Sequence, residues 1–122
     1  MFVTVPALRL FWSYNDELAG HLRRYSTDDL RHLAESTGFT LLESRYFMFF
    51  LSPLLYLSRQ FPPKLDRTDR AVVRAHFERT HRVPAPPVNA LLDAVMVAEG
   101  ALGRWMSYPW GTSVLAVLQK SP

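Results

Sequence analysis

Three observations predict that this sequence forms a single α/β domain. Residues 2–5, 39–47 and 113–119 are rich in β-branched and aromatic side chains, which predicts three strands. The segments between them carry apolar residues at helical spacing, so helices alternate with the strands. The chain has 122 residues, of which 48% are hydrophobic and 20% charged, a composition typical of one folded domain (1–122) rather than a disordered chain.

The first half of the chain predicts a strand, two helices and a second strand. A proline stops the strand at residues 2–5, and residues 7–20 hold a short helix that ends near a glycine. Ser26 and Asp29 have the spacing of a capping box, which predicts the start of the next helix. Gly38 is placed to end that helix in the left-handed conformation. The strand at residues 39–47 follows.

The second half begins with an apolar helix predicted over residues 48–61, which Pro62 and Pro63 end. Residues 62–87 are polar, basic and flanked by prolines, so we expect a mobile loop that is partly helical over 68–79.

Asn89 then predicts the N-cap of a helix that runs to Leu102. Its expected buried face is formed by Leu91, Leu92, Val95, Ala98 and Leu102. The final strand at 113–119 is continuously apolar, which predicts cover on both faces of the sheet.

Charge and cysteine content restrict the class of protein. The net charge of +3 equals the excess of six basic over three acidic residues between Pro62 and Val83, so the basic character is local. Because that segment has few aromatic residues for base stacking, we expect no nucleic-acid binding. The absence of cysteine and of signal-peptide features fits a cytoplasmic protein. None of the five glycines has the spacing of a nucleotide-binding loop.

Several motifs in order resemble one enzyme family. Residues 5–30 read VPALRLFWSYNDELAGHLRRYSTDDL, and a helix ending in TGF follows. Later come PAPPVNALL at residues 84–92, PWGTSVLAV at 109–117, and Lys120. This series is similar to the C-terminal half of class I S-adenosylmethionine-dependent methyltransferases of the ubiquinone-biosynthesis-like (methyltransferase type 11) group. The resemblance covers nearly the whole chain.

The resemblance implies a partial Rossmann-like methyltransferase sheet with packing helices. Residues 2–5 would be the family's strand five, 39–47 its strand six, and 113–119 its antiparallel strand seven between them. The family's cofactor-binding half, with its glycine-rich loop and ribose-binding acidic residue, is absent from the sequence. We therefore expect a truncated enzyme that does not bind S-adenosylmethionine alone.

One segment holds the densest set of functional side chains. His21 is the candidate general base for methyl transfer, because its ordinary pKa suits proton transfer near neutral pH. The candidate substrate-binding residues are Trp12, Asp16, Arg23, Arg24 and Tyr25. The alternative is structural: His21 and Tyr25 cap local backbone while one arginine pairs with Asp16.

Two other groups have weaker functional signals. His76, Glu78 and His81 lack the spacing that aligns two imidazoles on one helix face, so we expect no metal site. The apolar residues 48–61 suit a membrane contact, a helix on the sheet or lid over the acceptor, or a dimer interface. Because the polar face lacks lysines, membrane contact is the least favoured of these.

The sequence therefore predicts the acceptor-side portion of a methyltransferase, inactive alone, that acts on a small-molecule or lipid-like acceptor. The alternative is a non-catalytic α/β module that self-associates or binds a partner. The expected partners are a second copy of the chain or a complementing cofactor-binding half, since a chain this short buries its core poorly.

Overall fold

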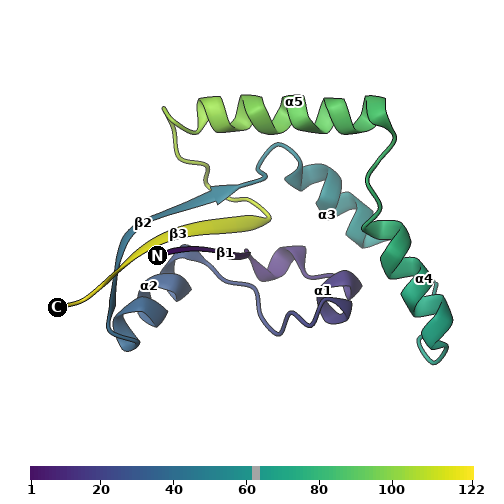
Figure 1. Ribbon diagram of the computed structural model, residues 1–122, viewed down its shortest axis with the longest axis horizontal. Coiled ribbons are helices and arrows are strands. Elements are labelled where there is room, and N and C mark those ends of the chain that lie inside the picture. The colour runs from purple at the N-terminus through teal and green to yellow at the C-terminus, as the bar shows by residue number, and fades with distance from the viewer. Residues whose placement is uncertain (62–63) are drawn as a thin grey trace.

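The computed structural model describes residues 1–61 and 64–122 and shows an α/β fold with an open, antiparallel three-stranded sheet. The strands are β1 (Phe2–Pro6), β2 (Phe39–Phe47) and β3 (Ser113–Lys120), which confirms the three predicted strands. Their order is β1-β3-β2, so the last strand lies between the two earlier ones and is antiparallel to both (Figure 1). β1 and β2 therefore run parallel and end at the same edge of the sheet.

The connection from β1 to β2 contains the 3₁₀ helix η1 (Arg9–Phe11) and the helices α1 (Tyr14–Leu18) and α2 (Thr27–Ser36). The predicted capping box is present at α2. The Asp29 amide donates to Ser26 Oγ at 3.1 Å, and the Ser26 amide donates to Asp29 Oδ2 at 2.8 Å. Gly38 follows the helix with φ 77°, which confirms its predicted role.

The hydrophobic core lies between α2 and one face of the sheet. Leu30 and Ala34 of α2 are buried against this face, where Val114 and Ala116 of β3 are fully buried. A β-bulge after Leu41 shifts the register of β2 against β3. The bulge allows Leu41 to join the same core as Tyr46, although the two lie five positions apart and simple alternation would put them on opposite faces.

The other face of the sheet is only partly covered, so the expectation that β3 is enclosed on both sides is wrong. Leu115 and Val117 point to this face and are half-buried. Helix α5 (Pro86–Leu102) lies across it (Figure 1), but a cavity of about 370 Å³ separates Met96 of the helix from Leu115 of the sheet.

Two helices precede α5 in the chain. Helix α3 (Ser52–Gln60) begins later than predicted, because Met48 has φ 60° and breaks any continuous helix from that residue. Its expected end at Pro62–Pro63 lies outside the described residues. Helix α4 (Arg70–Thr80), capped by the Asp69 carboxylate, confirms the partly helical expectation. The segment 62–87 is therefore not simply a loop, because it contains α4 and the first residues of α5.

The start and the buried face of α5 both differ from the prediction. The helix begins at Pro86 after Ala85, so Asn89 is not its N-cap. Leu91 and Leu102 are exposed, because α5 does not pack tightly on the sheet. The buried side chain is instead Glu99, whose carboxylate accepts hydrogen bonds from two successive backbone amides, Phe49 at 3.1 Å and Phe50 at 3.0 Å. This contact joins α5 to the turn before α3.

Candidate functional site

The edge where β1 and β2 end is the first candidate for a site. In open α/β sheets, ligands bind beyond the carboxyl ends of the parallel strands. Leu8, two residues after β1, has φ 54°, and Met48, the residue directly after β2, has φ 60°. Among the described residues these are the two non-glycine residues with positive φ. Backbone strain of this kind clusters at functional sites, and here it marks both strand ends.

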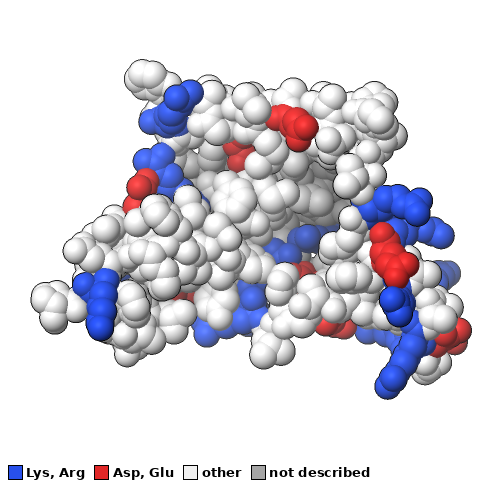
Figure 2. All heavy atoms as spheres, in the orientation of Figure 1, with Lys and Arg blue, Asp and Glu red and all other residues white. Residues whose placement is uncertain are grey.

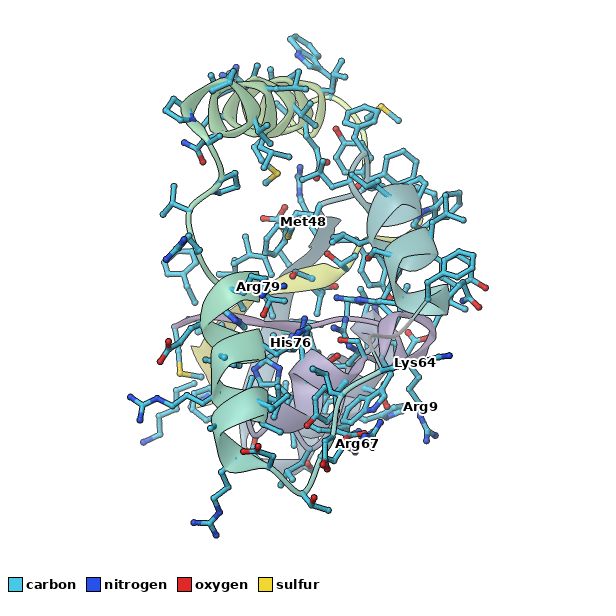
Figure 3. All side chains as sticks on the ribbon, turned by 90° about the vertical axis from the view of Figure 1, so that its right-hand side faces the viewer. Arg9, Met48, Lys64, Arg67, His76 and Arg79 are labelled. Carbon is cyan, nitrogen blue, oxygen red and sulfur yellow. The ribbon has the colours of Figure 1, made fainter. Side chains whose placement is uncertain are left out.

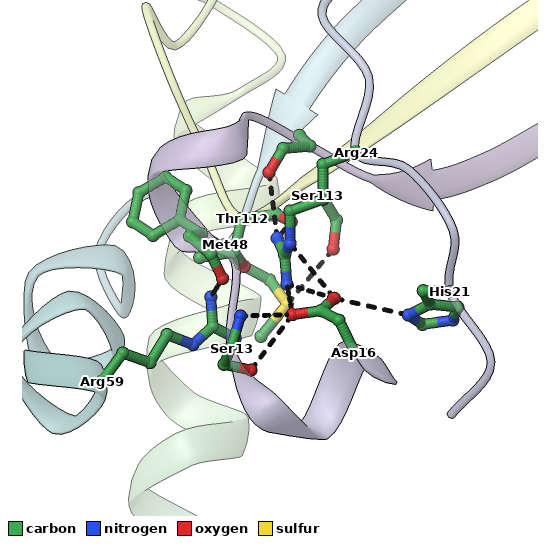
Figure 4. A network of polar contacts seen from close by, with 10 residues as sticks. Ser13, Asp16, His21, Arg24, Met48, Arg59, Thr112 and Ser113 are labelled. Carbon is green, nitrogen blue, oxygen red and sulfur yellow. Dashed lines mark hydrogen bonds and ion pairs between the residues drawn. The ribbon is translucent and has the colours of Figure 1, made fainter. Parts of the chain in front are cut away.

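A buried ion pair lies beside this edge. The Arg24 guanidinium donates from Nη2 to Asp16 Oδ1 at 2.8 Å and to Oδ2 at 3.0 Å, and from Nε to Oδ1 at 3.1 Å (Figure 4). The Ser13 amide and hydroxyl also donate to Asp16 Oδ2, at 2.8 and 3.0 Å. Asp16 and Arg24 are only 3% and 6% exposed. Each charge is therefore compensated inside the protein.

Arg24 also holds the end of β1 against the start of β3. Its Nη1 donates to the carbonyl of Ala7 at 2.9 Å and to the carbonyl of Thr112 at 3.2 Å. Arg24 and Asp16 were predicted to bind substrate, but both side chains are buried and fully engaged with one another and with backbone. One arginine thus pairs with Asp16, as the structural alternative expected, but the His21 side chain contacts the Asp16 carboxylate and not the backbone.

The environment of Asp16 favours its charged form. Burial raises the pKa of the Asp16 carboxyl, but the hydrogen bonds from the Ser13 amide and the Arg24 guanidinium, together with the Arg24 charge, outweigh burial. The pKa of Asp16 is therefore below its ordinary value of 3.8. Asp16 is an anion at neutral pH.

His21 is oriented by the same carboxylate. Its Nδ1 lies 3.4 Å from Asp16 Oδ1, while the imidazole is 46% exposed. When Nδ1 donates to Asp16, Nε2 is the ring nitrogen left to accept a proton. The structure thus brings the predicted base together with Asp16 and Arg24. This arrangement can hold the imidazole in one tautomer for proton transfer.

The remaining predicted residues lie beside this network, and Arg24 itself helps to line the concavity of Trp12 and Arg23. Trp12 and Arg23 line a surface concavity of about 930 Å³, and Arg23 pairs with Asp29 at 2.7 Å. Arg23 also stacks over the Tyr25 ring, with 5.1 Å to its centroid. Tyr25 packs against the core, and its backbone pairs with that of Ala7. Trp12 and Arg23 are thus open to a ligand, whereas Tyr25 packs against the core.

The basic segment contacts α1 instead of forming one continuous basic face. Figure 2 shows blue and red side chains together at the α4 end of the molecule. The Arg67 guanidinium lies 4.6 Å from the centroid of the Tyr14 ring and 3.9 Å from the Glu17 carboxylate. His76, Glu78 and His81 lie along and just after α4, and no group of metal-ligating side chains occurs in the described parts of the chain.

Sequence reasoning missed Arg59 and Glu99. Arg59 of α3 donates to the carbonyl of Phe11, and Glu99 binds the turn before α3. In the sequence, each is a charged residue that stands alone in an apolar segment. Arg59 is the one charged residue in 46–61, and apolar or glycine neighbours flank Glu99 on both sides. Isolated charged residues in apolar segments tend to have buried partners.

No family model, curated protein or solved structure matches the chain. In the part of the chain that the structure describes, no helix has both the length and the apolar character needed to cross a membrane.

Proposed function

We propose that this chain is the acceptor-side, C-terminal portion of a class I S-adenosylmethionine-dependent methyltransferase. The observation that carries the proposal is the strand order β1-β3-β2 with an antiparallel central strand. It is the order expected if β1, β3 and β2 correspond to strands five, seven and six of the family's Rossmann-like sheet. The motif series in residues 5–30 is the second support.

In this proposal the reaction takes place beyond the carboxyl ends of β1 and β2. His21, held through Nδ1 by Asp16, accepts a proton from the methyl acceptor at Nε2. Trp12 and Arg23 contact the acceptor in the concavity that they line. Asp16 and Arg24 act as positioning residues, since they hold His21 and the end of β1.

The residues present do not fit S-adenosylmethionine as a ligand of this chain alone. The family binds the cofactor with a glycine-rich loop after a strand, whereas Gly20 and Gly38 follow helices and Gly111 packs against Phe47. Titration calorimetry of the chain with S-adenosylmethionine should therefore show no binding tighter than about millimolar. A micromolar constant would overturn the half-enzyme proposal.

The positive test is complementation. The reading frame upstream of Met1 should encode a strand followed by a glycine-rich loop and a helix, and that segment joined to the chain should bind the cofactor. In the joined protein, His21→Asn should slow methyl transfer by about 10²- to 10⁴-fold, whereas His32→Asn on the exposed face of α2 should not. Equal effects would remove His21 from the mechanism.

A self-associating or partner-binding module is the second candidate function. It is favoured by the half-covered sheet face and by the outer edge of β1, with which no strand among the described residues pairs. An upstream frame without a glycine-rich strand–loop–helix would support this module over the methyltransferase.

A further inference from the structure

The cavity of about 370 Å³ between α5 and the open face of the sheet is within the size range of small-molecule sites. Phe47 and Leu115 line it from β2 and β3, and Met96 and Gly100 line it from the helix. Figure 3 shows α5 held away from the strands, with Met48 marking the end of β2 below it. The helix thus forms a roof over the strands without filling the space between them.

Apolar side chains make up most of the cavity wall. Phe47 and Leu115 contribute on the side of the sheet, and Met96 and Met106 contribute on the side of α5 and the loop after it. Methionine side chains adapt to the shape of a bound molecule, because they are unbranched and flexible. Water in an apolar cavity finds few hydrogen-bond partners. The wall therefore favours a hydrocarbon occupant over water.

Three polar side chains of the wall already have partners within the protein. The Glu99 carboxylate accepts hydrogen bonds from two backbone amides of the turn before α3. The Tyr108 hydroxyl donates to the Glu99 carbonyl at 2.7 Å, and Arg45 donates from Nη1 to the carbonyl of Gly103. A ligand is therefore not needed to satisfy these groups. The other polar lining residues are exposed to solvent: Thr4, Arg104 and Ser107.

The charges of the wall disfavour a charged ligand of either sign. Burial and the negative charge of Glu99 raise the pKa of Tyr108, so this charge acts within the wall, where it also opposes an anion. Arg45 does not offset it, because its guanidinium already pairs with Glu43. A cation would instead meet Arg45 and Arg104, both of which line the cavity. A ligand without charge avoids both costs.

We infer that the cavity under α5 binds an uncharged, hydrocarbon-rich small molecule, such as a medium-chain alcohol or a two-ring aromatic compound. Its apolar body lies between Met96 of the helix and Leu115 of the sheet. The driving force is the removal of apolar surface from water, which is roughly proportional to the area buried. Affinity should therefore rise by about fourfold for each methylene group that the cavity accepts.

This inference goes beyond methyl transfer and does not rest on it. The residues that line the cavity do not include His21, Asp16 or Arg24, and the argument uses only the wall under α5. Loss of the proposed methyltransferase function would leave the cavity and its lining unchanged.

The test compares two fluorescent probes that differ by one charged group. N-phenyl-1-naphthylamine is uncharged, and 8-anilinonaphthalene-1-sulfonate has the same ring system with a sulfonate. In titrations of the full chain, we expect the uncharged probe to bind saturably, one molecule per chain, and at least about tenfold more tightly than the sulfonate. Hexanol, heptanol and octanol should displace it with affinities that rise by about fourfold at each step. No saturable binding, or equal or tighter binding of the sulfonate, overturns the inference.

Two consecutive residues of α5 provide a matched pair of variants. Met96 lines the cavity, whereas Val97 is 73% exposed and lies outside the lining. Met96→Trp fills the cavity and should weaken binding of the uncharged probe by at least about tenfold, and Val97→Trp should not change it. If Met96→Trp does not fold, as judged by circular dichroism, Leu115→Phe fills the cavity from the opposite wall and replaces it. Wild-type affinity in a folded cavity-filling variant overturns the inference.

The other possible occupant is a side chain from a second copy of the chain. In that case the probe would displace the second copy, and light scattering would show the mass of the protein halved at saturating octanol. We expect the mass to be the same with and without octanol. A halved mass would assign the cavity to an interface between copies and overturn its role as a small-molecule site.

Discussion

Arg24 and Asp16 form a bidentate ion pair: Nη2 of Arg24 lies 2.8 Å from one carboxylate oxygen of Asp16 and 3.0 Å from the other. Both side chains are almost fully buried. The neighbouring arginine has the opposite environment: Arg23 is 60% exposed and pairs with Asp29 at 2.7 Å. Two consecutive arginines thus make one buried and one solvated ion pair, which provides a matched comparison.

The first prediction concerns these two arginines. Arg24→Met leaves the Asp16 charge buried without its partner and removes the contacts to Ala7 and Thr112, so it should lower the free energy of unfolding by about 3–5 kcal/mol. Arg23→Met should cost less than about 1 kcal/mol, because water screens its pair. Urea unfolding followed by circular dichroism measures both. Similar costs would contradict the structural role of Arg24.

The second prediction is acid sensitivity from Asp16. The pKa of Asp16 is lower in the folded protein than its ordinary value of 3.8, so the unfolded chain binds the proton more readily. The stabilisation is therefore complete above the ordinary value and is lost as the pH falls through the folded value. Urea unfolding from pH 7 to pH 2 should show the difference between wild type and Asp16→Asn shrinking at acid pH. A difference that does not change with pH would mean that Asp16 is not the source of the acid sensitivity.

The third prediction contrasts two glycines. A Cβ on Gly111 would collide with the backbone carbonyl of Phe47, because the turn before β3 passes close to the last residue of β2. Gly111→Ala should therefore destabilise the fold by at least about 1–3 kcal/mol. Gly100 in α5 has open space around it, so Gly100→Ala should stabilise by about 0.5–1 kcal/mol. Thermal unfolding of the two variants tests both signs, and destabilisation by Gly100→Ala would mean that α5 is packed more tightly than described.

The fourth prediction is that the smallest stable species is a homodimer. The outer edge of β1 lacks a strand partner in the described residues, and the face carrying Leu115 and Val117 is half-covered. Pairing of two copies would bury both features in one symmetric interface.

Light scattering after size exclusion measures the mass of that species. Phe2, on the open face of β1, is 77% exposed, and Phe2→Lys should weaken the dimer. Leu33→Lys, on the exposed side of α2, is the control that should leave it unchanged. A folded monomer near 14.1 kDa at micromolar concentration would contradict the prediction.

The strands and the best-capped helix could be predicted because local signals specify them. Ser26, Asp29 and Gly38 set the ends of α2 through contacts within a few residues, and β-branched runs mark the strands. The buried face of α5 could not be predicted in the same way. Its apolar residues surround most of the helix, and which of them are buried depends on how closely the helix approaches the sheet.

The candidate site shows the same division. The sequence concentrates Trp12, Asp16, His21, Arg23 and Arg24 in one segment, and the functional interest of this segment follows from residue types alone. Residue types alone do not predict which of the two arginines is buried, because Arg23 and Arg24 are chemically identical neighbours. Contacts with Ala7 and with Thr112, 88 residues away, select Arg24.

By itself, therefore, the sequence determined the α/β class, the three strands, the capping of α2 and the segment that carries the candidate base. Only the tertiary structure decided the cavity under α5 and the pairing of Asp16 with Arg24. The physical reason is the distance along the chain over which each interaction acts. Capping and strand propensity act between near neighbours in the chain, whereas burial and charge compensation depend on helices and strands that meet only after folding.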